Sequence, residues 1–129
     1  MQRITVVAPN RTGVLAEVTD VLARKGISIS SISADTLGSE GLIHIDLEDA
    51  DPAVAALTAA GHQTVTEDVL LARIADKPGA VAELSRRLLD ARLDIRALNM
   101  VQRQEGWAVI AVSTNDNAAA RKVLAGDAI

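Results

Sequence analysis

The chain has 129 residues, a length that suits one ordinary domain or two very small ones. It lacks cysteine, which excludes disulfides and thiolate metal sites, and its formal net charge of -4 argues against nucleic acid as a partner. Hydrophobic residues make up 49% of the chain, so we expect a packed core, although Trp107 is the only aromatic residue. No segment resembles a signal peptide or a bilayer span, so we expect a soluble cytoplasmic protein.

The first half of the chain alternates between β-rich and helical patterns. Apolar residues at helical spacing follow Val14, and Gly26 ends that helix as a C-terminal glycine does. A second helix is predicted to have Asp51 as its N-cap and Pro52 in its first position, and to end at Gly61. The predicted strands are 4–8, 27–35, 42–48 and 62–66, with a turn at 37–41.

The second half repeats the first at a shift of 66 residues. Gly13 then falls on Gly79 and Leu22 on Leu88. A strand over 69–74 and helices that open at 77–79 and run over 117–124 complete the second copy. In the strand after the first helix, apolar alternation slips at the same point in both copies, which predicts a shared bulge. We therefore predict one module at 1–67 and a second at 68–129, with 127–129 only a stump of the last strand.

The order βαββαβ with amphipathic helices predicts an α+β, ferredoxin-like sandwich in each module, with two helices on one face of an antiparallel sheet. His44, Asp46 and Glu48 alternate along one strand, so we expect them to face water on the open side of the first sheet. The equivalent stretch 107–112 is apolar on both sides. We expect the second open face to be covered, by another subunit.

The turn before the first helix of each module is the strongest candidate for a binding site. It reads Asn10-Arg11-Thr12-Gly13-Val14-Leu15 in the first copy and Asp76-Lys77-Pro78-Gly79 in the second. A helix N-terminus offers backbone N–H groups to a carboxylate or phosphate, and glycine lets a ligand approach closely. The side-chain oxygens of Asn10 and Asp76 can accept from an ammonium group. The turns therefore fit an α-amino acid, although the spacing alone favours an ordinary helix cap.

These turns, together with Gly26-Ile27-Ser28-Ile29 and Leu93-Asp94-Ile95, resemble the signature of the ACT domain, in two copies over nearly the whole chain. ACT domains are regulatory modules, many of which bind amino acids. The resemblance implies that the modules pair side by side into one larger antiparallel sheet. It also implies a ligand at the seam, between one glycine loop and the start of the neighbour's second strand. The implied contacts are Asn10, Arg11, Thr12, Gly13, Val14, Leu15, Ile27, Ser28, Asp76, Lys77, Gly79, Leu93 and Asp94.

The two copies depart from the family pattern in different ways. Thr12 replaces the usual proline before the glycine, and we expect its hydroxyl to cap the helix. Asp76 and Asp94 would hold an ammonium group but repel a nearby carboxylate. The first-copy loop is therefore the preferred site.

Other chemistry has little support in the sequence. His44 and His62 lie on different elements, so we interpret them as solvated surface residues and expect no metal site. Glu17 and Glu83 lie in first helical turns, where we interpret them as structural residues that offset the helix dipole. No nucleophile motif, phosphate loop or dinucleotide spacing is present, so we expect neither an enzyme nor a cofactor.

The sequence thus predicts a stand-alone regulatory protein that senses a small or aliphatic amino acid or a similar metabolite. It would act as a homodimer or through a metabolic enzyme, without nucleic acid or membrane partners. The alternative is a ligand-free protein–protein interaction module, or a regulatory subunit of a metabolic enzyme.

Overall fold

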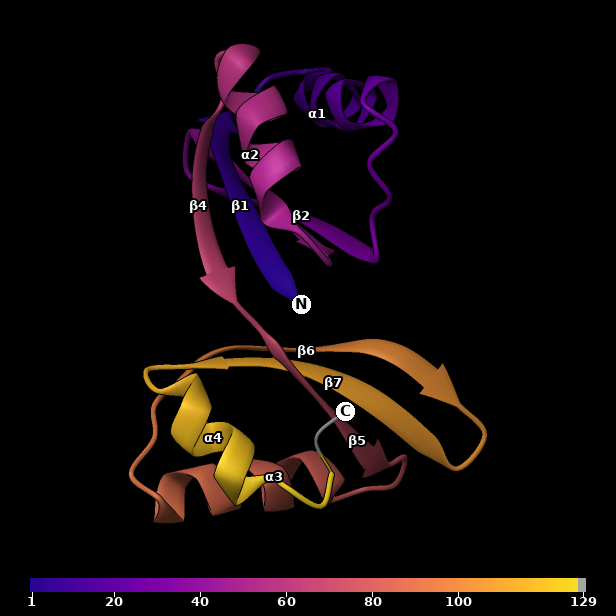
Figure 1. Ribbon diagram of the computed structural model, residues 1–129, viewed down its shortest axis with the longest axis vertical. Coiled ribbons are helices and arrows are strands. Elements are labelled where there is room, and N and C mark those ends of the chain that lie inside the picture. Colours follow the sequence, from indigo (N-terminus) through magenta and orange to yellow (C-terminus); the bar gives the residue numbers. More distant parts are fainter. Residues whose placement is uncertain (128–129) are drawn as a thin grey trace. The chain divides into compact units, whose positions relative to one another are not determined.

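The computed structural model of the chain describes residues 1–127, except for the side chain of Leu37. The chain divides into two compact units, Met1–Glu67 and Asp68–Ile129, each with its own sheet and helices (Figure 1). No helix in the described part is long and apolar enough to cross a membrane.

The first unit has the predicted βαββαβ order. Its sheet has the strand order β2-β3-β1-β4, and both β1 and β2 pair antiparallel with β3. Helices α1 and α2 lie on one face of this sheet (Figure 1). This is the ferredoxin-like sandwich expected from the pattern. The elements are β1 (Gln2–Pro9), α1 (Val14–Arg24), β2 (Ser31–Leu37), β3 (Glu40–Leu47), α2 (Ala50–Ala59) and β4 (Gln63–Asp68).

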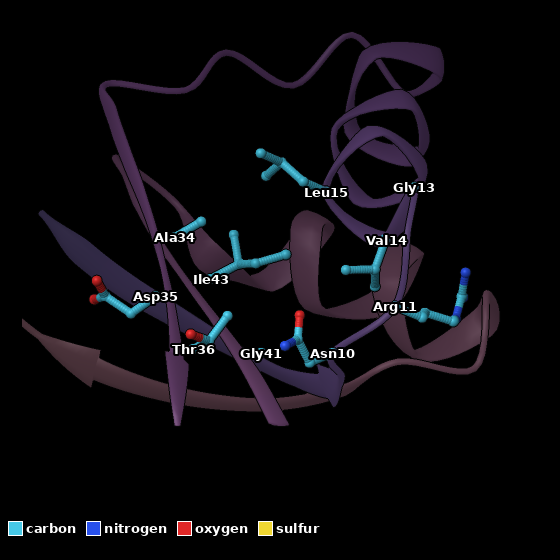
Figure 2. Close-up of a pocket in the computed structure, with 10 residues that line it drawn as sticks. All are labelled: Asn10, Arg11, Gly13, Val14, Leu15, Ala34, Asp35, Thr36, Gly41 and Ile43. Carbon is cyan, nitrogen blue, oxygen red and sulfur yellow. The ribbon is translucent and has the colours of Figure 1, made fainter. Parts of the chain in front are cut away.

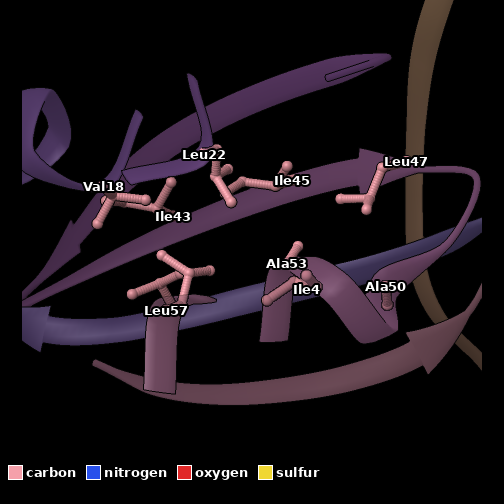
Figure 3. Packing of buried hydrophobic residues seen from close by; sticks show 10 residues of the cluster. Ile4, Val18, Leu22, Ile43, Ile45, Leu47, Ala50, Ala53 and Leu57 are labelled. Carbon is pink, nitrogen blue, oxygen red and sulfur yellow. The ribbon is translucent and has the colours of Figure 1, made fainter. Parts of the chain in front are cut away.

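The core of the first unit follows from the two periodicities of its elements. Alternate residues of β1 and β3, such as Ile4 and Ile45, point toward the helices, and α1 presents Val18 and Leu22 to them (Figure 3). Leu57 closes the core from α2, and each of these side chains is fully buried. Burial of one such side chain stabilises a fold by about 1.5–3 kcal/mol.

The second unit repeats this architecture with a three-stranded sheet of order β5-β7-β6 in the described residues. In the first unit β4 lies beside β1; in the second, Asp127 occupies the corresponding edge, where its carbonyl accepts a 2.7 Å hydrogen bond from the backbone N–H of Arg73 on β5. The rest of the predicted strand stump, 128–129, lies outside the described residues. The elements are β5 (Leu70–Ala75), α3 (Ala80–Asp90), β6 (Ile95–Gln104), β7 (Trp107–Thr114) and α4 (Asn117–Val123).

The predicted slip after the first helix takes a different form in each unit. In the second unit the β6–β7 register shifts between Ile95 and Ala97, which confirms the bulge there. In the first unit, 27–30 precede the ladder, and β2 begins only at Ser31, so the prediction of a strand from residue 27 is wrong at its start. Ile27 and Ile29 pack against the core instead, and the Ser30 N–H reaches the Asp46 carbonyl at 2.8 Å.

Helix α2 begins two residues earlier than predicted. Its N-cap is Asp49, whose side chain accepts a 3.1 Å hydrogen bond from the N–H of Asp51. The prediction of Asp51 as the cap and Pro52 as the first residue is therefore wrong. The two aspartates have equal capping propensity and are separated only by Ala50. Proline is tolerated within the first turn because its missing N–H would be unpaired there.

Asp46 does not face water, contrary to the prediction from alternation. It is 2% exposed and binds Arg3 through two hydrogen bonds, Nε–Oδ1 at 2.7 Å and Nη2–Oδ2 at 2.9 Å. The Ser31 hydroxyl donates a third, at 2.7 Å. His44, on the same side of β3, is half-buried and lies 3.0 Å from the Thr5 hydroxyl through Nδ1. The alternating pattern correctly predicted that these side chains share one face of β3. It could not show that Arg3 of β1 and Ser31 of β2 would bind Asp46 on that face.

The second sheet is uncharged where the first carries the Arg3–Asp46 pair. Val109, Ala111 and Ser113 on β7 are all buried. Near the start of this strand, the Arg73 guanidinium lies over the Trp107 ring, 4.4 Å from its centroid, in a cation–π contact. Coverage of this face by another subunit stays a prediction.

Candidate functional site

The four helices begin in two different ways. The two that follow the glycine turns, α1 and α3, have Gly13 and Gly79 as N-caps, both left-handed with φ of 87° and 90°, and neither start receives a side-chain hydrogen bond. By contrast, α2 and α4 are capped by aspartates, Asp116 in the case of α4. The prediction that Thr12 caps α1 is therefore wrong. The starts of α1 and α3 keep backbone N–H groups that no side chain caps, together with the positive end of the helix dipole.

Glycine is required at residue 13 by the backbone and not by crowding. A Cβ added to Gly13 would have no atom within 4 Å, but a left-handed conformation costs other residues about 1–2 kcal/mol. The chain therefore accepts a conformation that only glycine adopts cheaply, in a turn that leaves open space beside the backbone. This combination is typical of a turn that a ligand approaches.

A cavity of about 470 Å³ lies between this turn and the β2–β3 hairpin (Figure 2). The Asn10 N–H donates to the Ser39 carbonyl at 2.8 Å, which ties the glycine turn to the hairpin turn. The lining residues come from the glycine turn and from α1, β2 and β3: Asn10, Arg11, Gly13, Val14, Leu15, Ala34, Asp35, Thr36, Gly41 and Ile43.

The lining of this first cavity divides into a polar and an apolar part. Asn10, Asp35 and Thr36 supply polar side chains, and Asp35 brings a carboxylate. Among the apolar lining residues, Leu15 is 42% exposed, so part of its apolar surface is open to a ligand. The cavity can therefore receive a ligand with both charged and aliphatic groups.

Arg11 is held by a carboxylate of α1. Its Nη2 donates to Oε2 of Glu17 at 2.7 Å, and this bond lowers the pKa of Glu17 below its ordinary value. The other carboxylate oxygen of Glu17 lies 3.3 Å from Nε2 of His62. The His62 side chain is only 7% exposed, so the prediction that it is a solvated surface residue is wrong. Its Nε2 is out of line for a hydrogen bond to Glu17 and has no hydrogen-bond partner within the described chain.

The second glycine turn opens on a cavity of about 560 Å³ with a different polar arrangement. Here Asp76 is held by Arg103 of β6 through two hydrogen bonds, of 2.9 and 3.1 Å. The Arg103 guanidinium lowers the pKa of Asp76 below its ordinary range. Lys77 and Gly79 also line this cavity. The acceptor oxygens that the sequence assigned to an ammonium group are therefore already engaged by a cation of the chain.

The comparison with protein families gives one match. The model of the ACT domain matches residues 2–60, which contain the glycine turn, α1, the hairpin and α2. The first unit is an ACT domain. The second unit follows it with the same element order as far as α4, the last element of the described residues, and with its first helix displaced by 66 residues. A search of curated proteins gives no match.

Solved structures share this tandem fold. A Bacteroides thetaiotaomicron protein aligns over 99% of this chain and 90% of its own, with a TM-score of 0.87 and 22% identity. The ligand-free regulatory subunit of aspartate kinase from Thermus thermophilus aligns over 98% of this chain and 91% of its own, with a TM-score of 0.72 and 18% identity. Aspartokinase III of E. coli, in complex with aspartate and ADP, aligns over 95% of this chain and 30% of its own, with a TM-score of 0.58 and 19% identity. At these identities the likeness establishes the fold.

The strand residues that the family resemblance implied as ligand contacts lie outside the two glycine-turn cavities. Ile27 and Leu93 pack against the two hydrophobic cores, whereas Ser28 and Asp94 are exposed. The Asp94 N–H donates to Oδ1 of Asn115 at 2.9 Å. None of the four lines either glycine-turn cavity, and Thr12 does not line the first. Their roles as ligand contacts stay predictions.

Sequence reasoning missed the strand residues that do line the ACT-domain cavity, Ala34, Asp35 and Thr36. Their signal was present in the hairpin register, which pairs Asp35 with Leu42 and Thr36 with Gly41 next to the glycine turn. No group of three or more metal-binding side chains occurs among residues 1–127.

Proposed function

We propose that the chain is a regulatory protein that binds a small or aliphatic α-amino acid in the cavity of its ACT domain. The observation that carries this proposal is the uncapped start of α1, which opens on a cavity with acceptor oxygens and an apolar wall. The regulatory role is supported by the family and by the aspartate kinase regulatory subunit that shares the fold.

The three groups of an α-amino acid match three parts of the cavity. The ligand carboxylate binds the backbone N–H groups at the start of α1, where the helix dipole favours an anion. The ammonium group donates to the Oδ1 atom of Asn10 and to Asp35. The aliphatic side chain covers Leu15 and Ile43 and removes apolar surface from water.

The first cavity is preferred over the second because of the charges that already face each turn. Asn10 is neutral, and within the described residues its side-chain amide makes no hydrogen bond. In the second unit, a ligand ammonium would compete with the Arg103 guanidinium for Asp76. Displacement of that bidentate bond would reduce the binding energy available at the second turn.

Output from binding must pass through a partner or through the oligomeric state, since the sequence offers no catalytic motif. A ligand shifts a protein between two states only to the extent that it binds one of them more tightly. The proposed output is a ligand-dependent change in how the chain associates with a second copy or with a metabolic enzyme.

The first test is a thermal-shift panel of the common amino acids on the full chain, with two matched glycine variants. Gly13→Ala and Gly79→Ala impose the same left-handed strain, about 1–2 kcal/mol, and neither adds a steric contact. A ligand at about 100 times its Kd adds about 2.7 kcal/mol to the free energy of unfolding, which raises Tm by several degrees. We expect this rise in the wild type and in Gly79→Ala, and its loss in Gly13→Ala.

A second variant tests the site without backbone strain. Asn10→Asp with Thr36→Arg copies the Asp76–Arg103 pair into the first cavity, since Thr36 and Arg103 occupy equivalent hairpin positions. We expect this double variant to lose the amino-acid response. A response that survives both this variant and Gly13→Ala places the ligand elsewhere, and no response in the wild type overturns the proposal.

One observation favours the alternative, a protein–protein interaction module. Leu15 and Ile32 are both more than two-fifths exposed and line an apolar groove of about 550 Å³ beside the edge strand β2. A buried interface would remove this surface from water. If no amino acid stabilises the chain, sedimentation of wild type and Ile32→Ser decides this alternative. A fall in mass for the variant supports it.

A further inference from the structure

Three charged or titratable side chains from separate parts of the ACT domain meet beside the glycine turn. Arg11 lies in the glycine turn, Glu17 in the first turn of α1, and His62 between α2 and β4. Glu17 stands between the other two, with one carboxylate oxygen 2.7 Å from Arg11 Nη2 and the other 3.3 Å from His62 Nε2. Two groups that lie 51 residues apart, at 11 and 62, thus share one carboxylate.

The bond to Glu17 draws the Arg11 guanidinium away from the cavity. Figure 2 shows the Arg11 side chain extended away from Asn10 and from Ala34 and Asp35 on β2. Arg11 lines the cavity, but its cationic end is directed at α1. Guanidinium is the side-chain group that best matches a carboxylate, so in this position its charge is withheld from the ligand carboxylate.

His62 is placed to alter this bond. Its imidazole is buried, and the charged groups that face it are Glu17 on α1 and, beyond Glu17, Arg11 of the turn. The last turn of α2, which ends next to His62, carries no basic residue, and β4 begins with the neutral Gln63. When the imidazole is neutral, Arg11 is the only cation of this cluster that binds the Glu17 carboxylate. A protonated imidazole adds a second cation that competes for the same carboxylate.

We propose that Glu17 is a positioning residue that holds Arg11 out of the ligand cavity, and that protonation of His62 frees Arg11 to turn toward a bound carboxylate. This inference rests on the proposed function, because it assigns Arg11 to the ligand of that same site. It adds a role for two residues outside the cavity lining. It also makes the position of Arg11 depend on the protonation of one imidazole, His62.

The direction of the pH effect follows from charge. A proton on His62 places a positive charge beside Glu17, which then neutralises the Glu17 carboxylate in place of Arg11. The affinity for a carboxylate ligand therefore rises on acidification. An amine of the same shape that lacks the carboxylate gains nothing, because Arg11 repels its ammonium group.

The first measurement needs no ligand. Side-chain NMR of the full chain follows the Arg11 Nε–H and the two histidine imidazoles against pH, with His44 as the internal reference. We expect the Arg11 signal to shift with the His62 titration in the wild type and to be insensitive to it in His62→Gln. An Arg11 signal that ignores the His62 titration in the wild type overturns the proposal.

The second measurement uses L-valine and isobutylamine as probes in calorimetric titrations at about pH 8 and about pH 6, on either side of the ordinary pKa of histidine. We expect valine to bind about 3- to 5-fold more tightly at the lower pH, as for a partly exposed ion pair gained, and isobutylamine to show no gain. Glu17→Gln should bind valine more tightly than wild type at the higher pH and lose the pH dependence. Arg11→Gln combined with Glu17→Gln should remove that gain.

Asp20→Asn is the matched control, because Asp20 is another α1 carboxylate paired with an arginine, Arg24 at 2.8 Å. It removes the same charge and should leave the valine profile as in wild type. Weaker valine binding in Glu17→Gln at the higher pH would mean that Glu17 holds Arg11 in its binding position, which overturns the proposal. If no amino acid stabilises the chain while Arg11 still follows His62, the proposed function fails and the coupling of the three residues stands.

Discussion

The two glycine turns have the same backbone and opposite side-chain chemistry. Gly13 and Gly79 differ in φ by only 3°, from 87° to 90°, and each opens a helix that no side chain caps. In the first turn the anchored residue is a cation, Arg11, and the anion that holds it comes from the following helix. In the second turn the anchored residue is an anion, Asp76, and the cation comes from the neighbouring strand.

This difference shows that a repeated backbone does not repeat a binding site. Thr36 and Arg103 occupy equivalent positions, because each belongs to the last pair but one of its hairpin, Thr36 opposite Gly41 and Arg103 opposite Ala108. Each residue also lines the cavity beside the glycine turn of its own unit. A short neutral side chain leaves the first cavity open, whereas a long cationic one spans the second. In the proposed binding mode, the side chain at this strand position determines whether a cation of the chain competes with the ligand ammonium group.

The largest expected effect concerns a buried ion pair that the second unit lacks. Arg3 and Asp46 are charged and buried, whereas the strand pairing of the second sheet places Val69 and Ser113 at the equivalent positions. Asp46→Asn leaves the Arg3 charge without its carboxylate, and we expect a loss of about 3 kcal/mol in the free energy of unfolding, measured by urea titration.

The control for this pair replaces both charges. Arg3→Met with Asp46→Leu should recover most of the loss, because an apolar pair of similar volume is often as stable as a buried ion pair. If Asp46→Asn alone leaves the free energy of unfolding unchanged, the stability of the first unit does not depend on the ion pair. The two units then do not differ in this respect.

A matched pair of core substitutions asks whether the two units are equally well packed. Leu22 and Leu88 are fully buried and occupy the same position of the repeat, in α1 and α3. We expect Leu22→Ala and Leu88→Ala each to cost about 3 kcal/mol, the usual cost of a core cavity, by urea denaturation. A difference of more than about 2 kcal/mol, within the known spread for such cavities, would show that one core collapses around the cavity and the other does not.

The smallest effect concerns the exposed pair of the second turn. Arg103 lowers the folded-state pKa of Asp76, so the pair stabilises the chain above the unfolded-state pKa of aspartate, about 3.9, and this stabilisation is lost as pH falls through the lower folded value. We expect the fall in Tm between about pH 5 and about pH 3, on either side of the unfolded-state pKa, to be slightly smaller in Arg103→Thr than in wild type. An identical fall in both proteins would mean that solvent screens the pair completely.

The repeat and the glycine turns could be predicted from the sequence because their signals are local. A glycine at the start of an apolar helical pattern, seen twice at a fixed spacing, predicted both turns and the βαββαβ order that the structure confirms. The ends of elements were harder to predict. Asp49 and Asp51 are both good caps, and the choice between them depends on the packing of α2 and not on propensity.

The remaining features depend on contacts between residues far apart in the chain. Asp46 and Glu48 both belong to the polar alternation that begins on β3. Asp46 binds Arg3 and is buried, whereas Glu48 is exposed. His62 gave no signal that it would be buried beside Glu17, since neither residue has a motif around it. Interactions of this kind are set by strand register and helix rotation, which a one-dimensional pattern does not encode.

The contact between Arg73 and Trp107 gives the molecule a built-in optical probe. Trp107 is the single aromatic residue of the chain and lies on β7, so intrinsic fluorescence reports the second unit alone. The proposed amino-acid cavity belongs to the first unit and contains no fluorophore. Any change in emission when that cavity fills would therefore measure communication between the two halves of the chain, without an added label.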